Sequence, residues 1–108
     1  MRHYIAVILA EATSPAPGFA PLYQESFVLL TAGSAREARA KARRHGLAVE
    51  TTYENEAGEP VTWSLKQVVD VAEVLDADLG DGADLYARHF RDYAAYRSFE
   101  PLLSGEEL

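Results

Sequence analysis

Residues 53–74, YENEAGEPVTWSLKQVVDVAEV, set the architecture that we expect for this chain. They read as the end of one strand, an acidic turn in which Gly58 is available for positive φ, and a long apolar strand that carries the only tryptophan, Trp63. From Val61 the apolar residues first alternate and then occupy both faces, which predicts a bend or bulge near residues 66–67. The long strand is therefore expected to leave an exposed hairpin and enter the centre of a small sheet with helices attached.

Two further strands are predicted before this hairpin. Residues 3–11 are apolar on both faces, which is typical of a central strand. Residues 12–20 hold two prolines and a glycine and read as a loop, after which residues 23–31 read as the second strand. The length of the loop favours antiparallel pairing of these two strands.

A capping box gives the clearest local signal in the chain. The Ser34 hydroxyl can accept a hydrogen bond from the Glu37 backbone N–H, and the Glu37 carboxylate can reach back to the Ser34 N–H. The helix is predicted from Ala35 to about His45, and Gly46 is interpreted as its left-handed C′ residue. Alanines recur along one face of this helix, which favours close packing on a sheet.

The C-terminal part of the chain leaves a choice between strand and helix. Tyr86, Arg88 and Phe90 alternate like a strand, but aromatic residues from Tyr86 onward also fit helical spacing. We favour a strand over residues 84–91 that pairs with residues 68–75, followed by a short helix over residues 92–99.

The expected fold is thus α+β, with a small, mostly antiparallel sheet and elements in the order ββαβββα. The capped, Ala-rich helix would pack on the sheet, and a short helix would end the chain. Residues 1–103 would form a single domain, and residues 104–108 a frayed tail.

Composition and charge exclude several classes of function. The chain has no cysteine, and no apolar run approaches the roughly 20 residues that span a bilayer, so we expect a cytoplasmic protein without a membrane segment. The net charge of −7 argues against nucleic acid as a partner. The basic residues are nevertheless concentrated in residues 36–44, whereas residues 70–84 carry six acids and no base. These two charged segments either serve solubility or contact each other, within one molecule or between two.

No catalytic residue, metal site or cofactor can be assigned from motifs. The carboxylates Glu25, Glu54 and Glu56 are candidates for acid–base work only if the fold brings them together. The acidic residues 76–82 do not fit a calcium loop, which needs a bidentate Glu at its twelfth position, where this chain has Ala87. The three histidines are too dispersed for a local metal motif.

The candidate binding residues are aromatic or basic. Tyr53 and Trp63 would form an aromatic cross-strand pair if they face each other across the hairpin, either as core packing or as part of an aromatic groove on an open sheet face. Tyr86, Arg88 and His89 would line that groove and could orient a ligand. A second candidate surface is a stripe of arginines on the capped helix, which could bind an anion or an acidic partner: Arg36, Arg39 and Arg43.

Several segments also resemble a known family in their order and spacing. PLYQESFVLLTA, the Ala-rich helix, YENEAGEPVTWSLKQVVDV and DGADLYARHF are similar to stretches of the domain of unknown function 4288 family. The resemblance covers nearly the whole chain, roughly Tyr4 to Phe99. It implies a stand-alone bacterial domain of this size, and it carries over no reaction, cofactor or catalytic residue.

Two classes of function remain open. The first is a non-catalytic interaction or regulatory module that forms a homodimer or binds an unidentified protein partner, including a partner-neutralising protein as a special case. The second is a protein that binds a small anionic ligand, or a minor enzyme, with a pocket between the sheet and the C-terminal helix. The absence of a catalytic signature favours the first.

Overall fold

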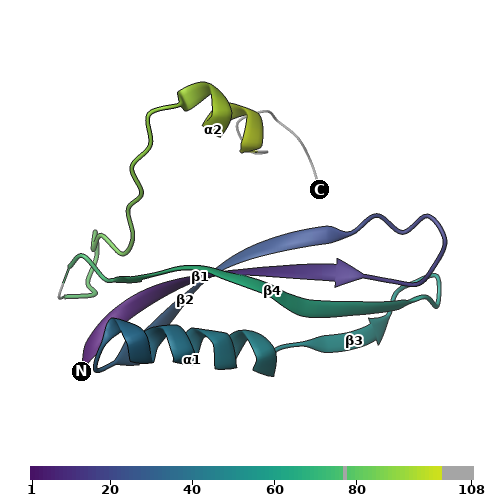
Figure 1. Cartoon of the computed structure of the whole chain (residues 1–108), viewed down its shortest axis with the longest axis horizontal. Helices are drawn as coiled ribbons and strands as arrows, with labels where there is room; N and C mark the ends of the chain where they lie inside the picture. Colours follow the sequence, from purple (N-terminus) through teal and green to yellow (C-terminus); the bar gives the residue numbers. More distant parts are fainter. Residues whose placement is uncertain (77, 101–108) are drawn as a thin grey trace.

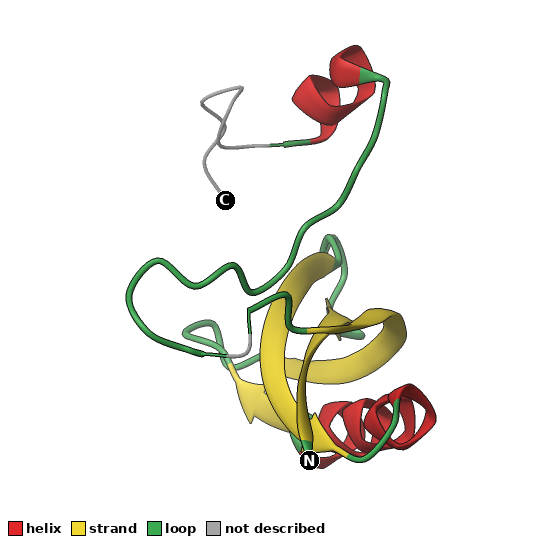
Figure 2. Ribbon diagram, turned by 90° about the vertical axis from the view of Figure 1, so that its left-hand side faces the viewer, coloured by secondary structure: helices red, strands yellow, loops and turns green. Residues whose placement is uncertain are grey.

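The computed structural model describes residues 1–76 and 78–100. Its elements follow one another as β1 (Arg2–Thr13), β2 (Leu22–Ala32), α1 (Ala35–Ala48), β3 (Thr51–Glu54), β4 (Pro60–Glu73) and α2 (Tyr93–Phe99). The strands form one antiparallel sheet in the order β2-β1-β4-β3, with α1 beside it (Figure 1). The sheet is strongly curled when viewed along its strands (Figure 2). The predicted α+β class and the central position of the first strand are confirmed.

The two-sided apolar character of β1 follows from its place between β2 and β4. On one side of the sheet, here called the helix face, Tyr4, Ala6 and Ile8 pack with Ala38 and Ala42 of α1 in the main core cluster. On the other side, here called the open face, β1 contributes Ile5 and Val7, which are also buried. A strand whose two faces are both covered must be apolar in every position, as the sequence of β1 is.

Helix α1 begins as predicted but ends later. The Ser34 hydroxyl accepts from the Glu37 N–H at 3.2 Å, whereas the Glu37 carboxylate accepts from the N–H of Gly33, one residue before the expected donor, also at 3.2 Å. The helix continues through Gly46 to Ala48, so the interpretation of Gly46 as the C′ residue is wrong. A Cβ at Gly46 would lie 2.8 Å from Cδ1 of Leu65, so this glycine allows the helix to approach β4 closely.

Two irregularities in β4 confirm the predicted bend and explain part of the curl. The register against β1 shifts between Val7 and Ile8 and again between Leu9 and Ala10. The shifts leave Val69 and Lys66 of β4 without a partner residue on β1. Such bulges bend the strand and increase its right-handed twist.

The hairpin between β3 and β4 corrects the expected aromatic pair. Trp63 lies opposite Thr51, and Tyr53 lies opposite Val61, so Tyr53 and Trp63 are diagonal neighbours and do not face each other. The side chain of Asn55 accepts hydrogen bonds from the N–H groups of Ala57 at 3.0 Å and Glu59 at 2.9 Å. These bonds fix the loop over residues 55–59, and the loop length in turn fixes the register.

The predicted strand over residues 84–91 is wrong, so the element order is ββαββα. The chain starts back along β4, with the Asp76 N–H donating to the Asp84 carbonyl at 3.3 Å. The Asp84 N–H then donates to the Asp76 carboxylate at 2.9 Å. The following residues leave the edge of β4 and cross the open face as an irregular segment, because Tyr86 contacts side chains on both β4 and β2.

The short C-terminal helix is confirmed as α2, with Asp92 as its N-cap. Among the described residues, α2 packs against no other helix or strand, and both views show it set apart from the sheet (Figures 1 and 2). The expected frayed tail, residues 104–108, lies outside the described residues. The extent of a single domain over residues 1–103 stays a prediction.

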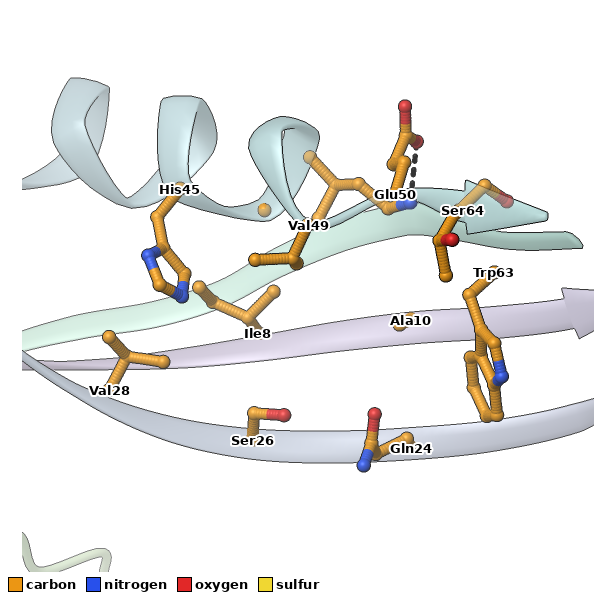
Figure 3. Close-up of a pocket in the computed structure, with 13 residues that line it drawn as sticks. Ile8, Ala10, Gln24, Ser26, Val28, His45, Val49, Glu50, Trp63 and Ser64 are labelled. Carbon is orange, nitrogen blue, oxygen red and sulfur yellow. Dashed lines mark hydrogen bonds between the residues drawn. The ribbon is translucent and has the colours of Figure 1, made fainter. Parts of the chain in front are cut away.

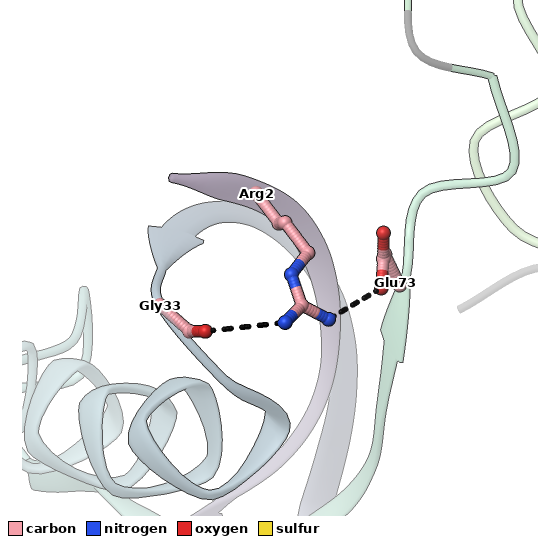
Figure 4. Close-up of polar contacts among 3 residues, drawn as sticks. All are labelled: Arg2, Gly33 and Glu73. Carbon is pink, nitrogen blue, oxygen red and sulfur yellow. Dashed lines mark hydrogen bonds and ion pairs between the residues drawn. The ribbon is translucent and has the colours of Figure 1, made fainter.

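At the end of the sheet where β4 stops, Arg2 joins three parts of the chain (Figure 4). Its guanidinium donates to the Glu73 carboxylate at 3.3 Å and to the Gly33 carbonyl at 3.5 Å. It therefore ties the start of β1 to the end of β4 and to the turn before α1. Both side chains of the ion pair are more than half exposed, so its contribution to stability is at most about 1 kcal/mol.

Candidate functional site

Tyr86 is the point where the C-terminal segment is fastened to the sheet. Its hydroxyl donates to the Asp70 carboxylate on β4 at 2.6 Å, and its ring lies 6.1 Å from the ring of Phe27 on β2. Phe27 and Asp70 are the two register partners of Val7, so Tyr86 spans the central strand over Val7, which is fully buried. Burial, and then the hydrogen bond to the Asp70 carboxylate, raise the pKa of Tyr86 above its usual 10.0.

Beyond Tyr86 the chain forms an extension, residues 87–100, that we call the arm. It carries several large apolar side chains that face solvent, with Phe99 74% exposed. The only ring contact in the arm joins Phe90 and Tyr96, which stack with centroids 4.9 Å apart, within the part of the chain that the structure describes. On the open face, Phe27 is 61% exposed despite its contact with Tyr86. The open face and the arm therefore expose two apolar surfaces in one chain.

The arm and the open face together line an open groove of about 810 Å³. The predicted residues Tyr86, Arg88 and His89 all lie on this groove. Three carboxylates also line it, from Glu25, Asp92 and Glu100.

A second pocket, of about 460 Å³, lies on the helix face beyond the last turn of α1 (Figure 3). Its floor is β1, where Ile8 is followed in phase by the small Ala10. Trp63 closes one end, and His45 extends from α1 towards the sheet near the other end. Along the β2 side, Gln24 and Ser26 point into the same space.

The structure separates the predicted binding residues into different surfaces. Tyr86, Arg88 and His89 are brought together on the groove. Trp63 lies in the helix-face pocket, and Tyr53 lies exposed on the hairpin beside it. The basic stripe on α1 is exposed and borders neither cavity: Arg36, Arg39 and Arg43.

Sequence reasoning missed the residues that accompany Trp63. Gln24 and Ser26 alternate in phase with Val28 and Leu30 of β2, so the pattern already placed them on the core side of the strand. Polar residues that alternate in phase with core residues could therefore have indicated a cavity on this face. His45 has no such signal, because the helix predicted from the sequence ends at about this residue.

Residues 1–76 and 78–100 contain neither a metal-binding cluster nor a membrane-spanning helix. No group of three or more His, Asp or Glu side chains there is placed to hold a metal ion. None of the helices in the described part of the chain is long and apolar enough to cross a membrane.

These features define a small α+β protein in which one helix covers part of a curled antiparallel sheet. The chain belongs to the family described as Domain of unknown function (DUF4288), which matches residues 3–87. This confirms the family resemblance that the sequence predicts. The match contains α1 and all of the sheet except Arg2, and it ends beside Tyr86, so the rest of the arm lies outside it. No curated protein and no solved structure gives a significant match to the chain.

Proposed function

We propose that this protein is a non-catalytic interaction module that forms a homodimer by exchange of its arms. In this dimer, α2 of each copy would occupy the groove beside the open face of the other copy. The observation that carries the proposal is the exposure of two large apolar surfaces, at Phe27 and along the arm, in a chain of this size. Monomeric proteins rarely expose apolar patches of more than a few hundred Å² unless the patches bind something.

The geometry of α2 favours a second copy as the partner. A helix as short as Tyr93–Phe99 is not stable by itself in water, and within the described residues α2 has no buried residue. Its aromatic side chains need a surface, and the sheet side of the groove offers three apolar or aromatic side chains, Phe27, Val69 and Tyr86. A dimer with a two-fold axis would cover the arm and the groove of both copies, because each copy supplies one arm and one groove.

The charges of the groove argue against the alternative of a small anionic ligand. Its lining carries the guanidinium of Arg88 and the imidazole of His89, but also three carboxylates. A free anion would meet a net negative surface there. An arm from a second copy instead carries three arginines (Arg88, Arg91 and Arg97) and two acids (Asp92 and Glu100), a net charge of +1 with His89 neutral, which suits this surface better than an anion does.

Sedimentation velocity over a wide range of protein concentration tests the proposal. We expect a dimer that changes little with salt, because apolar contacts would dominate it. Phe27→Ser in the groove and Phe99→Ser in the arm should each weaken the dimer by about 30-fold or more, as expected for aromatic anchors at an interface. Leu47→Ser on α1 is the control, because Leu47 is also exposed, at 45%, but lies on neither surface.

Mixing the two variants tests the exchange itself. A dimer of one Phe27→Ser chain and one Phe99→Ser chain would keep one contact between Phe99 of one copy and Phe27 of the other. Because losses at two residues in contact are not additive, the mixture should associate more strongly than either variant alone. A monomer at all concentrations would refute self-association. If the dimer dissociates with added salt and neither substitution weakens it, the interface would instead be formed by the arginine stripe and the acidic residues 70–84.

A further inference from the structure

We infer that the helix-face pocket is a binding site for a neutral, planar small molecule of one or two rings, stacked on Trp63. This inference is independent of the proposed dimer, because the pocket and the groove lie on opposite faces of the sheet. The first argument is the origin of the cavity. Helix α1 ends at Ala48, whereas β1 continues beneath it to Thr13, so the helix leaves the last part of this face uncovered. Ala10 lies on the floor there, where a larger side chain would fill the space.

The second argument is the set of polar side chains around this cavity. Gln24, Ser26 and Ser64 line it, and His45 reaches it from the helix. Throughout residues 1–76 and 78–100, the side chains of these four residues form no hydrogen bond with another protein group. Side chains with unused donors and acceptors that converge on an apolar cavity are the usual means by which a ligand is oriented.

The third argument is the charge of the lining. Of the residues that the structure describes, neither a lysine nor an arginine lines this pocket, so a phosphate or carboxylate would lack a fixed counter-charge. The one acid, Glu50, is engaged, because its carboxylate accepts from the Leu65 N–H at 2.8 Å (Figure 3). The remaining groups can recognise amide, carbonyl or ring-nitrogen edges without a charge on the ligand.

The fourth argument is size and shape. About 460 Å³ is near the lower end of the range for small-molecule pockets, which suits one or two rings. The pocket is a slot between α1 and β2 with the indole of Trp63 at its end (Figure 3). An indole face favours a flat, aromatic ligand by stacking.

NMR titration tests the site with three probes. Nicotinamide is a neutral heteroaromatic amide, nicotinate replaces the amide by a carboxylate, and cyclohexanecarboxamide keeps the amide but loses the flat ring. Trp63 is the only tryptophan, so its indole N–H signal in an ¹⁵N spectrum reports on the pocket without ambiguity. We expect nicotinamide to produce saturable shifts of this signal and of Ser26 and Ser64, with a Kd of about 1 mM, as for a fragment of its size. Nicotinate and cyclohexanecarboxamide should each bind at least about tenfold more weakly.

Two substitutions complete the test. Ala10→Leu fills the floor and should abolish the saturable shifts. Gln24→Leu should leave the fold unchanged, because Gln24 is exposed, and should weaken the binding of nicotinamide by about tenfold. Gln67→Leu is the matched control, because Gln67 is exposed on the open face and should leave binding unchanged. Absence of saturable shifts at Trp63, tighter binding of nicotinate, or equal effects of Gln24→Leu and Gln67→Leu would each overturn the inference.

Discussion

Removing the hydroxyl of Tyr4 should make this protein more stable. Tyr4 is 2% exposed, on the helix face between β1 and α1, and its hydroxyl has no hydrogen-bond partner among the described residues. A buried hydroxyl without a partner costs about 1–3 kcal/mol in proteins, and Tyr4→Phe removes that cost while the ring keeps its packing. We therefore expect the free energy of unfolding to rise by about 1 kcal/mol, which raises Tm by roughly 4–8 °C in a domain of this size.

Thermal and urea denaturation at low protein concentration measure this effect. Low concentration is needed because dimer formation would itself raise the apparent stability. Tyr4→Ala is the control for packing, and it should lower the free energy of unfolding by about 3 kcal/mol or more. If Tyr4→Phe instead loses about 1 kcal/mol, the hydroxyl is hydrogen-bonded in solution and the reasoning is wrong.

Two further substitutions test contacts that the sheet makes with the segment after Asp84 and with α1. The pKa of Tyr86 is higher in the folded state than its unfolded value of 10.0, so the stability from its neutral hydroxyl is present below pH 10 and is lost as the pH rises through the folded pKa. Tyr86→Phe should remove this alkaline loss, as measured by urea denaturation on both sides of pH 10. Gly46→Ala should raise the free energy of unfolding by less than the roughly 1 kcal/mol that the better helix propensity of alanine would give, as measured by urea denaturation, because its Cβ would lie 2.8 Å from Cδ1 of Leu65 and moving that side chain has a cost. Leu65→Val should relieve that cost in the double variant, and an additive result would refute the contact.

Local patterns predicted the parts of the fold that depend on local physics. The alternation in β1 and β4 and the capping residue Ser34 gave the correct elements, because each of these signals acts over a few residues. The direct pairing of Tyr53 with Trp63 does not form, because the register of the two strands depends on which residues belong to the loop. The hydrogen bonds of Asn55 hold residues 55–59 as the loop. The predicted end of α1 was wrong because Gly46 allows close packing against Leu65, a residue distant in sequence, and does not end the helix.

The segment after Asp84 shows a different kind of failure. Its alternation is real, but alternation describes the spacing of side chains and does not supply a strand partner. Tyr86 binds Asp70 on β4 and contacts Phe27 on β2, and one residue can reach both only if the chain crosses the sheet. The candidate residues Tyr86, Arg88 and His89 thus lie between the open face and the arm, whereas Trp63, which was expected in the same groove, lies on the opposite face.

Both candidate surfaces have the same physical origin. The central strand β1 is apolar on both faces, so the fold must cover two sides of one sheet. The one helix that packs on the described sheet, α1, covers part of the helix face and ends before the sheet does, which leaves the pocket beside Trp63. On the open face Tyr86 covers Val7, but Phe27 and the arm stay exposed. A chain that leaves both faces of its sheet partly uncovered has surface for two different contacts. Because these lie on opposite sides of β1, substitutions at Phe27 and Gln24 can separate one from the other.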